Sequence, residues 1–158
     1  MKKIIQRSFL IIFLLTTISC GFKVMDGSAK EKFTIKEIST TGDKRINYKI
    51  KNNLLAETNK SSSIILIVNL ETNKNKSIKE KNIKNEIEKY EILIKTKVRF
   101  NLENNKEEQE FNVEVIGEYS VGDRYSASIN AEKSLINGLT MQISNKIRNQ
   151  LNIKINDL

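Results

Sequence analysis

The clearest pattern in the chain is an apolar residue at every fourth position from Ala127 to Leu151. This spacing keeps the apolar side chains on one side of an α-helix. It predicts an amphipathic helix of about 25 residues that lies on a sheet, with Asp123 as its candidate N-cap. Gly138 interrupts the helix, and we expect it to mark a close approach to a neighbouring element.

Two earlier segments, Tyr90–Leu102 and Phe111–Tyr119, alternate between mostly apolar and mostly polar residues. Alternation with a period of two is typical of a β-strand that is buried on one face. A four-residue turn over residues 103–106, which pairs Leu102 with Glu107, would bring the two apolar rows to the same face. The same register sets two pairs of opposite charge across the strands: Lys95 with Glu114, and Arg99 with Glu110.

The preceding region predicts a strand, a helix and a second strand. Lys32–Ile38 reads as a short strand with a slip in its alternation before Ile38, and Ser39–Asp43 as a turn. Apolar residues at i, i+4 and i+8 then favour a helix from Ile46 to about Thr58. The continuous apolar run Ser63–Leu70 is typical of a central strand buried on both faces.

Residues 71–86 are rich in lysine and asparagine, and we expect a mobile loop there. The element order is then β-α-β-β-β-α. It predicts an α+β fold, in which a four-stranded mixed sheet has both helices packed on one face and leaves the other face open. Leu93 and Ile116 stand among the outward charges of this open face, which favours contact with a partner.

The N-terminus has the layout of a secretory signal. Basic residues precede an apolar core over Phe9–Leu15, and a short exit segment leads to the only cysteine, Cys20. The core is shorter than the ~20 apolar residues that span a bilayer. The sequence Thr17–Cys20 resembles the lipobox of bacterial lipoproteins, in which the cysteine sulfur is acylated and the cysteine becomes the first residue of the mature chain.

The chain therefore divides into a predicted lipoprotein signal peptide over residues 1–19, an acylated N-terminus and linker over 20–31, and one domain over 32–158. Two or more acyl chains on Cys20 would hold the domain stably on a membrane surface. The alternative is a secreted protein whose cysteine falls at this position by chance.

Composition narrows the classes of function. Removal of the signal peptide lowers the formal net charge from +8 to +5, so the domain is only mildly basic. The chain has no histidine, and acylation would use its only thiol, which excludes most zinc sites and all histidine-based catalysis. The acidic cluster Glu107, Glu108 and Glu110 and the serines Ser61–Ser63 have no positioned partner. We therefore expect a non-enzymatic protein without a cofactor or a metal site.

Three short motifs give the chain a resemblance to a known family. Cys20–Phe22 begins the mature chain, Glu88–Ile92 opens the strand pair, and Tyr125–Ser126 with Ala131–Glu132 leads into the long helix. In these motifs, and in the order and length of its elements, the chain resembles the LPS-assembly lipoprotein LptE family, whose members plug the outer-membrane β-barrel LptD. It departs from the family at Lys23–Met25, where arginine and leucine are usual, and it lacks the common linker proline.

The resemblance implies an outer-membrane lipoprotein that assembles and plugs the LPS-translocon barrel and assists insertion of LPS into the outer leaflet. The implied partners are an LptD-like barrel, lipopolysaccharide and, through palmitate on Cys20, the membrane. Gly21, in place of the aspartate that retains lipoproteins at the inner membrane, leaves the outer membrane as the default. Candidate contacts to LPS phosphates are Lys95, Lys97 and Arg99 on the open face, and the lysines of residues 71–86. The alternative is a solvated surface whose charges are balanced by facing glutamates.

Two other classes of protein are consistent with parts of the sequence. An auxiliary lipoprotein of a lipid-transporting ABC system would share the anchor and the size, but it would hold an apolar, lipid-sized pocket between helices and sheet. A secreted nucleic-acid binder would interleave aromatic and basic residues on one exposed face, and this chain lacks that pattern. We therefore expect no nucleic-acid partner.

Overall fold

The computed structural model describes residues 32–56 and 62–157, together with all their side chains except that of Lys106. The predictions for the signal peptide, Cys20 and the linker to Glu31 fall outside these residues. The chain order is β1 (Phe33–Gly42), α2 (Lys44–Ala56), β2 (Ile64–Lys81), β3 (Ile87–Leu102), β4 (Asn105–Ser120) and α3 (Tyr125–Asn156). The predicted α+β fold and its element order are confirmed.

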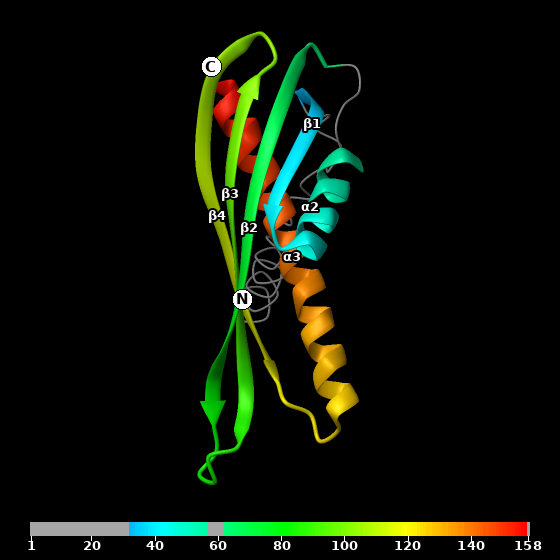
Figure 1. The fold of residues 1–158 in the computed structure, drawn as a ribbon, viewed down its shortest axis with the longest axis vertical. Helices are drawn as coiled ribbons and strands as arrows, with labels where there is room; N and C mark the ends of the chain where they lie inside the picture. Colours follow the sequence, from blue (N-terminus) through cyan, green and yellow to red (C-terminus); the bar gives the residue numbers. More distant parts are fainter. Residues whose placement is uncertain (1–31, 57–61, 158) are drawn as a thin grey trace, which may run out of the picture.

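The four strands form one mixed sheet in the order β1-β2-β3-β4, and both helices lie on the same face (Figure 1). β1 runs parallel to β2, and α2 connects them, whereas β2, β3 and β4 are antiparallel neighbours. The predicted slip in β1 is a register shift between Ile35 and Glu37, which turns Ile38 back toward the core.

The core lies between the sheet and the helices, where alternate strand residues meet the apolar sides of α2 and α3. Each such side chain contributes roughly 1.5–3 kcal/mol when fully buried. Thr72 and Thr96 take two positions in the buried rows, and their hydroxyl oxygens lie 2.9 Å apart in a hydrogen bond. The buried apolar residues are Phe33, Ile35, Ile38, Ile46, Ile50, Leu54, Leu66, Val68, Leu70, Ile92, Ile94, Val98, Phe100, Val113, Val115, Tyr119, Leu139, Ile143, Ile147, Leu151 and Ile155.

The predicted loop over residues 71–86 is wrong for most of its length. β2 continues to Lys81, and its outer part pairs with β3 from Ile87 onward, so the connection shrinks to Asn82–Glu86. The side chain of Asn82 accepts hydrogen bonds from the backbone N–H groups of Lys84 and Glu86, each at 2.9 Å, and this closes the turn. The outer part of β2 is polar because most of its side chains are exposed, while its backbone is satisfied by β3.

The turn between β3 and β4 is tighter than predicted. Leu102 pairs with Asn105 instead of Glu107, and a register shift between Phe100 and Leu102 absorbs the extra residues in β4. Glu107 and Glu108 therefore lie in a strand and not beside a turn. Beyond the shift the predicted register is confirmed: Arg99 is opposite Glu110, and Lys95 is opposite Glu114.

The predicted turn over Ser39–Asp43 is also shorter, because β1 pairs with β2 as far as Gly42. Gly42 has φ +91°, and a Cβ there would lie 2.0 Å from the carbonyl oxygen of Thr72, so only glycine fits this close approach. Asp43 alone separates β1 from α2, which begins at Lys44 instead of near Ile46 and ends, within the described residues, at Ala56.

α3 is longer than predicted, since Ile155 extends the apolar side of the helix beyond Leu151. Its N-cap is Arg124, without a side-chain capping bond, and not Asp123. Gly138 does not mark close packing, because no atom beyond its own stretch of helix lies within 4 Å of the position that its Cβ would take. The close approach is at Gly117 of β4, where a Cβ would lie 2.7 Å from Leu135 Cδ1.

Candidate functional site

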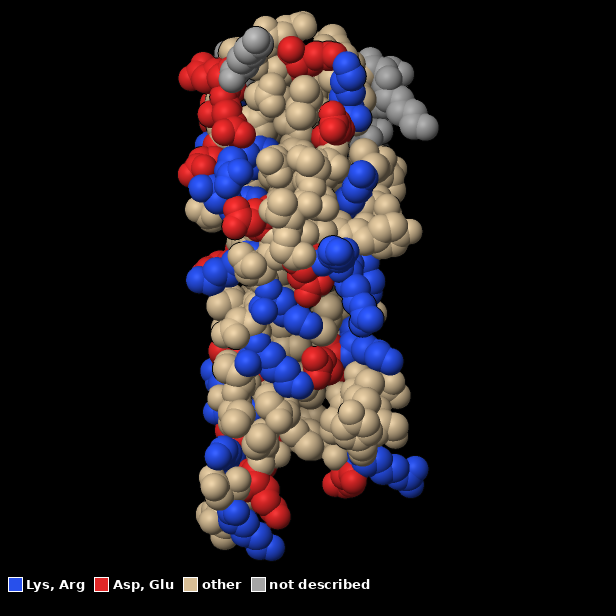
Figure 2. Space-filling view, viewed as in Figure 1, with Lys and Arg blue, Asp and Glu red and all other residues tan. Residues whose placement is uncertain are grey.

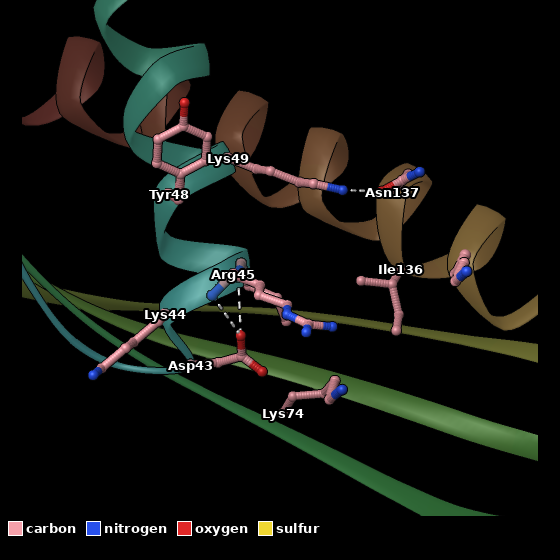
Figure 3. Close-up of a pocket in the computed structure, with 10 residues that line it drawn as sticks. Asp43, Lys44, Arg45, Tyr48, Lys49, Lys74, Ile136 and Asn137 are labelled. Atoms are coloured by element: carbon pink, nitrogen blue, oxygen red, sulfur yellow. Dashed lines mark hydrogen bonds between the residues drawn. The ribbon is translucent and has the colours of Figure 1, made fainter.

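A groove of about 520 Å³ lies where the beginning of α2 faces β2 and α3 (Figure 3). Its volume falls within the range of roughly 300–1,000 Å³ that is usual for small-molecule sites. Five of its ten lining residues are basic: Lys44, Arg45, Lys49, Lys74 and Lys133. We call this the basic groove.

The only acidic lining residue, Asp43, is occupied by the helix that it begins. Its Oδ1 accepts hydrogen bonds from the backbone N–H groups of Arg45, at 3.1 Å, and Ile46, at 3.0 Å. Asp43 is thus the N-cap of α2, and its charge is placed against the partial positive charge of the helix end. No acidic residue follows in the first turn, where Lys44 and Arg45 lie instead.

The basic side chains of the groove differ in direction. Figure 3 shows Arg45 and Lys74 reaching into the space between α2, β2 and α3, whereas Lys44 points away from it. Lys49 crosses to α3 and donates a hydrogen bond to the Oδ1 of Asn137. Within residues 32–56 and 62–157, Arg45, Lys74 and Lys133 have no carboxylate within the 4.0 Å of an ion pair.

Apolar groups complete the groove wall. Ile46 of α2 is almost fully buried, Ile136 of α3 is half-buried, and Tyr48 is 68% exposed. Lys and Arg predominate over Asp and Glu in the middle of this side of the molecule (Figure 2). The groove therefore combines positive charge with an apolar surface, and this suits an anion that carries an apolar group.

The predicted cations of the open face behave differently, because each faces glutamate. Lys95 Nζ lies 3.3 Å from Glu114 Oε2, and Lys97 Nζ lies 2.8 Å from Glu110 Oε2. Arg99 Nη2 lies 3.2 Å from Glu71 Oε2, which is nearer than Glu110. The hydrogen bond from Lys97 is the main cause that holds the pKa of Glu110 below its ordinary value, although burial opposes it. The structure thus places Lys95, Lys97 and Arg99 on the open face, as predicted, and glutamates balance their charges. We call these three residues the row.

Two apolar residues interrupt the charges of the open face. Leu93 of β3 and Ile116 of β4 are direct cross-strand partners, and Ile116 is 57% exposed. Cross-strand apolar pairs stabilise a sheet by about 0.2–1 kcal/mol, so the pair has a structural role as well as an exposed surface.

The lysines of residues 71–86 have different partners and lie in different places. Lys79 pairs with Glu91, with 2.8 Å between Nζ and Oε2, and Lys81 donates to the side chain of Asn85 at 2.9 Å. Lys74 lines the basic groove, and Lys76 lies in a separate polar cluster.

This cluster joins β2, β3, β4 and α3. Glu132 Oε2 accepts hydrogen bonds from Lys76 Nζ at 2.6 Å and from the Tyr119 hydroxyl at 2.8 Å. Lys76 Nζ also lies 4.2 Å from the centre of the Tyr90 ring. The bond from Lys76 lowers the pKa of Glu132, while burial raises that of Tyr119. Burial lowers the pKa of Lys76, but its interactions with Glu132 and Tyr119 outweigh this and raise it overall.

The candidate catalytic residues have structural contacts. Glu110 binds Lys97 and, more distantly, Arg99, and Ser62 Oγ donates to the carbonyl oxygen of Lys32 and accepts from the N–H of Ile64. Ser61 lies outside the described residues. In the part of the chain that the structure describes, no group of three or more acidic or cysteine side chains could hold a metal ion.

Neither the basic groove nor the Lys76 cluster was predicted from the sequence. Lys44 and Arg45 at the start of a predicted helix whose first turn holds no acidic residue were a visible signal. The contribution of Lys74 and Lys76 was hidden because residues 71–86 were interpreted as a loop. As part of β2, both side chains fall on the face that carries the helices.

Comparison with solved structures shows the same fold in bacterial lipoproteins. Rare lipoprotein B from Shewanella oneidensis matches with a TM-score of 0.58 and 15% identity, over 76% of this chain and 97% of its own. Lipoprotein B from Nitrosomonas europaea matches with a TM-score of 0.55 and 14% identity, over 81% and 90%. A candidate lipoprotein from Caulobacter crescentus CB15 matches with a TM-score of 0.53 and 19% identity, over 76% and 90%.

No model of a known protein family matches the chain, and neither does any curated protein. Among the described residues, no helix is both long and apolar enough to cross a bilayer. The structural likeness therefore establishes the fold that this chain shares with these lipoproteins.

Proposed function

We propose that the chain is an outer-membrane lipoprotein of the LptE family that assembles and plugs an LPS-translocon β-barrel. It would be held by acyl chains on Cys20, assist the insertion of LPS into the outer leaflet, and act without catalysis. The observation that carries the proposal is the fold shared with rare lipoprotein B over 97% of that chain, because the rare lipoprotein B proteins belong to the LptE family. The lipobox-like sequence before Cys20 supports it independently.

The shape of the domain supports a role as a plug. β2, β3 and β4 run nearly the full length of the molecule, and α3 lies along them, which makes the domain a narrow rod (Figure 1). The open face carries balanced charges and the apolar pair Leu93 and Ile116. Such a face could contact the polar wall of a barrel lumen without leaving unpaired charges buried.

The packing of the core weighs against the auxiliary lipoprotein of an ABC system. That class would need a lipid-sized apolar pocket between helices and sheet. In the described residues this layer is filled, because Ile94, Ile143 and Ile147 are fully buried where the sheet meets α3. The basic groove also lies between α2, β2 and α3, but it opens at the surface and half of its ten lining residues are basic, so it differs from the apolar pocket of that class.

Depletion of the protein in its native host tests the function. We expect surface LPS to fall, together with the amount of mature LptD-like barrel. Wild-type protein should restore both, whereas a Cys20→Ser variant should fail to incorporate labelled palmitate and should restore neither fully. Normal surface LPS and normal barrel levels after depletion would contradict the proposal.

The row Lys95, Lys97 and Arg99 stays our prediction for a contact with LPS phosphates. The sheet holds these cations at fixed spacing, but LPS would have to displace the facing glutamates. A triple change to alanine is expected to weaken binding of purified LPS to the protein. A folded triple variant that binds LPS normally would contradict this prediction.

A further inference from the structure

The basic groove brings together several cations that, among the described residues, have no carboxylate within ion-pair distance, although Glu132 acts on Lys74 at longer range. Arg45 comes from the first turn of α2, Lys74 from β2, and Lys133 from α3, so three elements far apart in sequence supply it. By contrast, each of Lys95, Lys97 and Arg99 faces a glutamate. A folded protein gains nothing from placing like charges together, so their convergence points to an anionic ligand.

The position of Arg45 at the start of a helix also favours a bound anion. Cations in the first turn of a helix lie against the partial positive charge of that end, which is unfavourable. Lys44 and Arg45 both occupy the first turn of α2, and Asp43 offsets them only as the N-cap. A bound anion would remove this repulsion, because it would meet the helix end and the basic side chains together.

The apolar wall narrows the class of ligand. Tyr48 of α2, which is 68% exposed, and Ile136 of α3 both line the groove and give it an apolar surface that a free inorganic ion would not use. Phosphate suits the charged side, since Arg binds phosphate oxygens through paired N–H donors and Lys binds them as a point charge. We propose that the basic groove binds the phosphate head of a lipid, with the first apolar part of the lipid against Tyr48 and Ile136.

This site is distinct from the row on the open face, because Lys74 and Lys95 lie on opposite faces of the sheet. The choice of a lipid as the carrier of the phosphate rests on the proposed lipid anchor, which would hold the groove close to a membrane surface. The site itself requires no barrel partner, so it can be tested on the isolated protein.

The test is calorimetric titration of full-length acylated protein, in a non-ionic detergent, with a short-chain phosphatidic acid. We expect saturable binding that weakens about tenfold or more in the variant Arg45→Gln, Lys74→Gln, Lys133→Gln, since charged hydrogen bonds are lost. The matched control removes the same number of charges outside the groove and the row: Lys36→Gln, Lys89→Gln, Lys146→Gln. It should bind within about twofold of the wild type, as expected where only net charge changes.

Two further arms identify the ligand class. Tyr48→Ala should weaken binding of phosphatidic acid but not of inorganic phosphate, and inorganic phosphate should bind more weakly than the lipid. If the triple variant fails to fold, the single variant Lys133→Gln replaces it, because Lys133 lies on the exposed side of α3. We expect this variant to weaken binding of the lipid by about threefold.

Four results would overturn the proposal. They are equal binding by the groove variants and the wild type, equal losses in groove and control variants, inorganic phosphate binding as tightly as the lipid, and hexaglutamate binding more tightly than the lipid. The last would indicate an acidic protein segment as the occupant. A negative titration would not contradict the proposed interaction with a barrel. Failure to recover a barrel would not contradict lipid binding in the groove.

Discussion

Two glycines have opposite roles at the residue scale. Gly117 lies where β4 meets α3, and a Cβ there would lie 2.7 Å from Leu135 Cδ1 and 3.1 Å from Leu139 Cδ2. Gly138 is exposed inside α3, and no atom beyond its own stretch of helix lies within 4 Å of an added Cβ. The first glycine is therefore needed for packing, whereas the second only lowers helix propensity.

We predict that Gly117→Ala lowers the free energy of unfolding by about 1–3 kcal/mol, because the leucine side chains must shift. Gly138→Ala should raise it by about 1 kcal/mol. Urea denaturation of both variants measures the difference. Equal effects of the two substitutions would contradict the observed contact between β4 and α3.

Glu132 gives a second prediction at this scale. Its pKa is lowered mainly by the hydrogen bond from Lys76, so its contribution to stability is present above its unfolded pKa, near 4.5, and is lost as pH falls through the lower folded pKa. Glu132→Gln should reduce the free energy of unfolding by about 1 kcal/mol at pH 7. This deficit should shrink below pH 4.5 in a pH series of denaturation curves. A deficit that does not change with pH would show that the charge is not responsible.

At the scale of elements, the outer part of β2 shows what local sequence cannot reveal. Residues 74–81 have a composition typical of loops, yet they form a ladder with β3. Strand formation there depends on a partner strand and a tight turn at Asn82–Glu86, and neither is a property of the segment itself. By contrast, the alternation in β3 and β4 and the i+4 pattern of α3 directly predicted the core, because burial repeats with the period of each element.

We predict that amide hydrogen exchange will distinguish the two halves of this region. Amides over residues 74–78 that point to β3 should exchange more slowly than those over 82–86, because β3 carbonyl groups accept their hydrogen bonds within a ladder, whereas the bonds of the turn lie at its exposed end. They should still exchange faster than those over 66–70, which lie between two strands and beneath the helices. Exchange of residues 74–78 at the rate of the turn would contradict the long strand.

At the scale of the whole molecule, the sequence predicted the architecture better than the site. The cross-strand register of Lys95 and Arg99 could be predicted, since it follows from facing rows of known parity. The basic groove could not, because it joins Arg45, Lys74 and Lys133, which only the packing of α2 and α3 on β2 brings together. The lipid anchor is predicted from the sequence, by Cys20 together with the basic and apolar segments that precede it.

The proposed plug is tested most directly by recovery of its partner. The full-length lipoprotein, tagged at its C-terminus, would be extracted gently from its native membranes and its stoichiometric partners identified by mass spectrometry, with an unrelated tagged outer-membrane lipoprotein as the control. We predict a large outer-membrane β-barrel at one to one. Recovery of ABC-transporter components, or of the protein alone, would contradict the central claim.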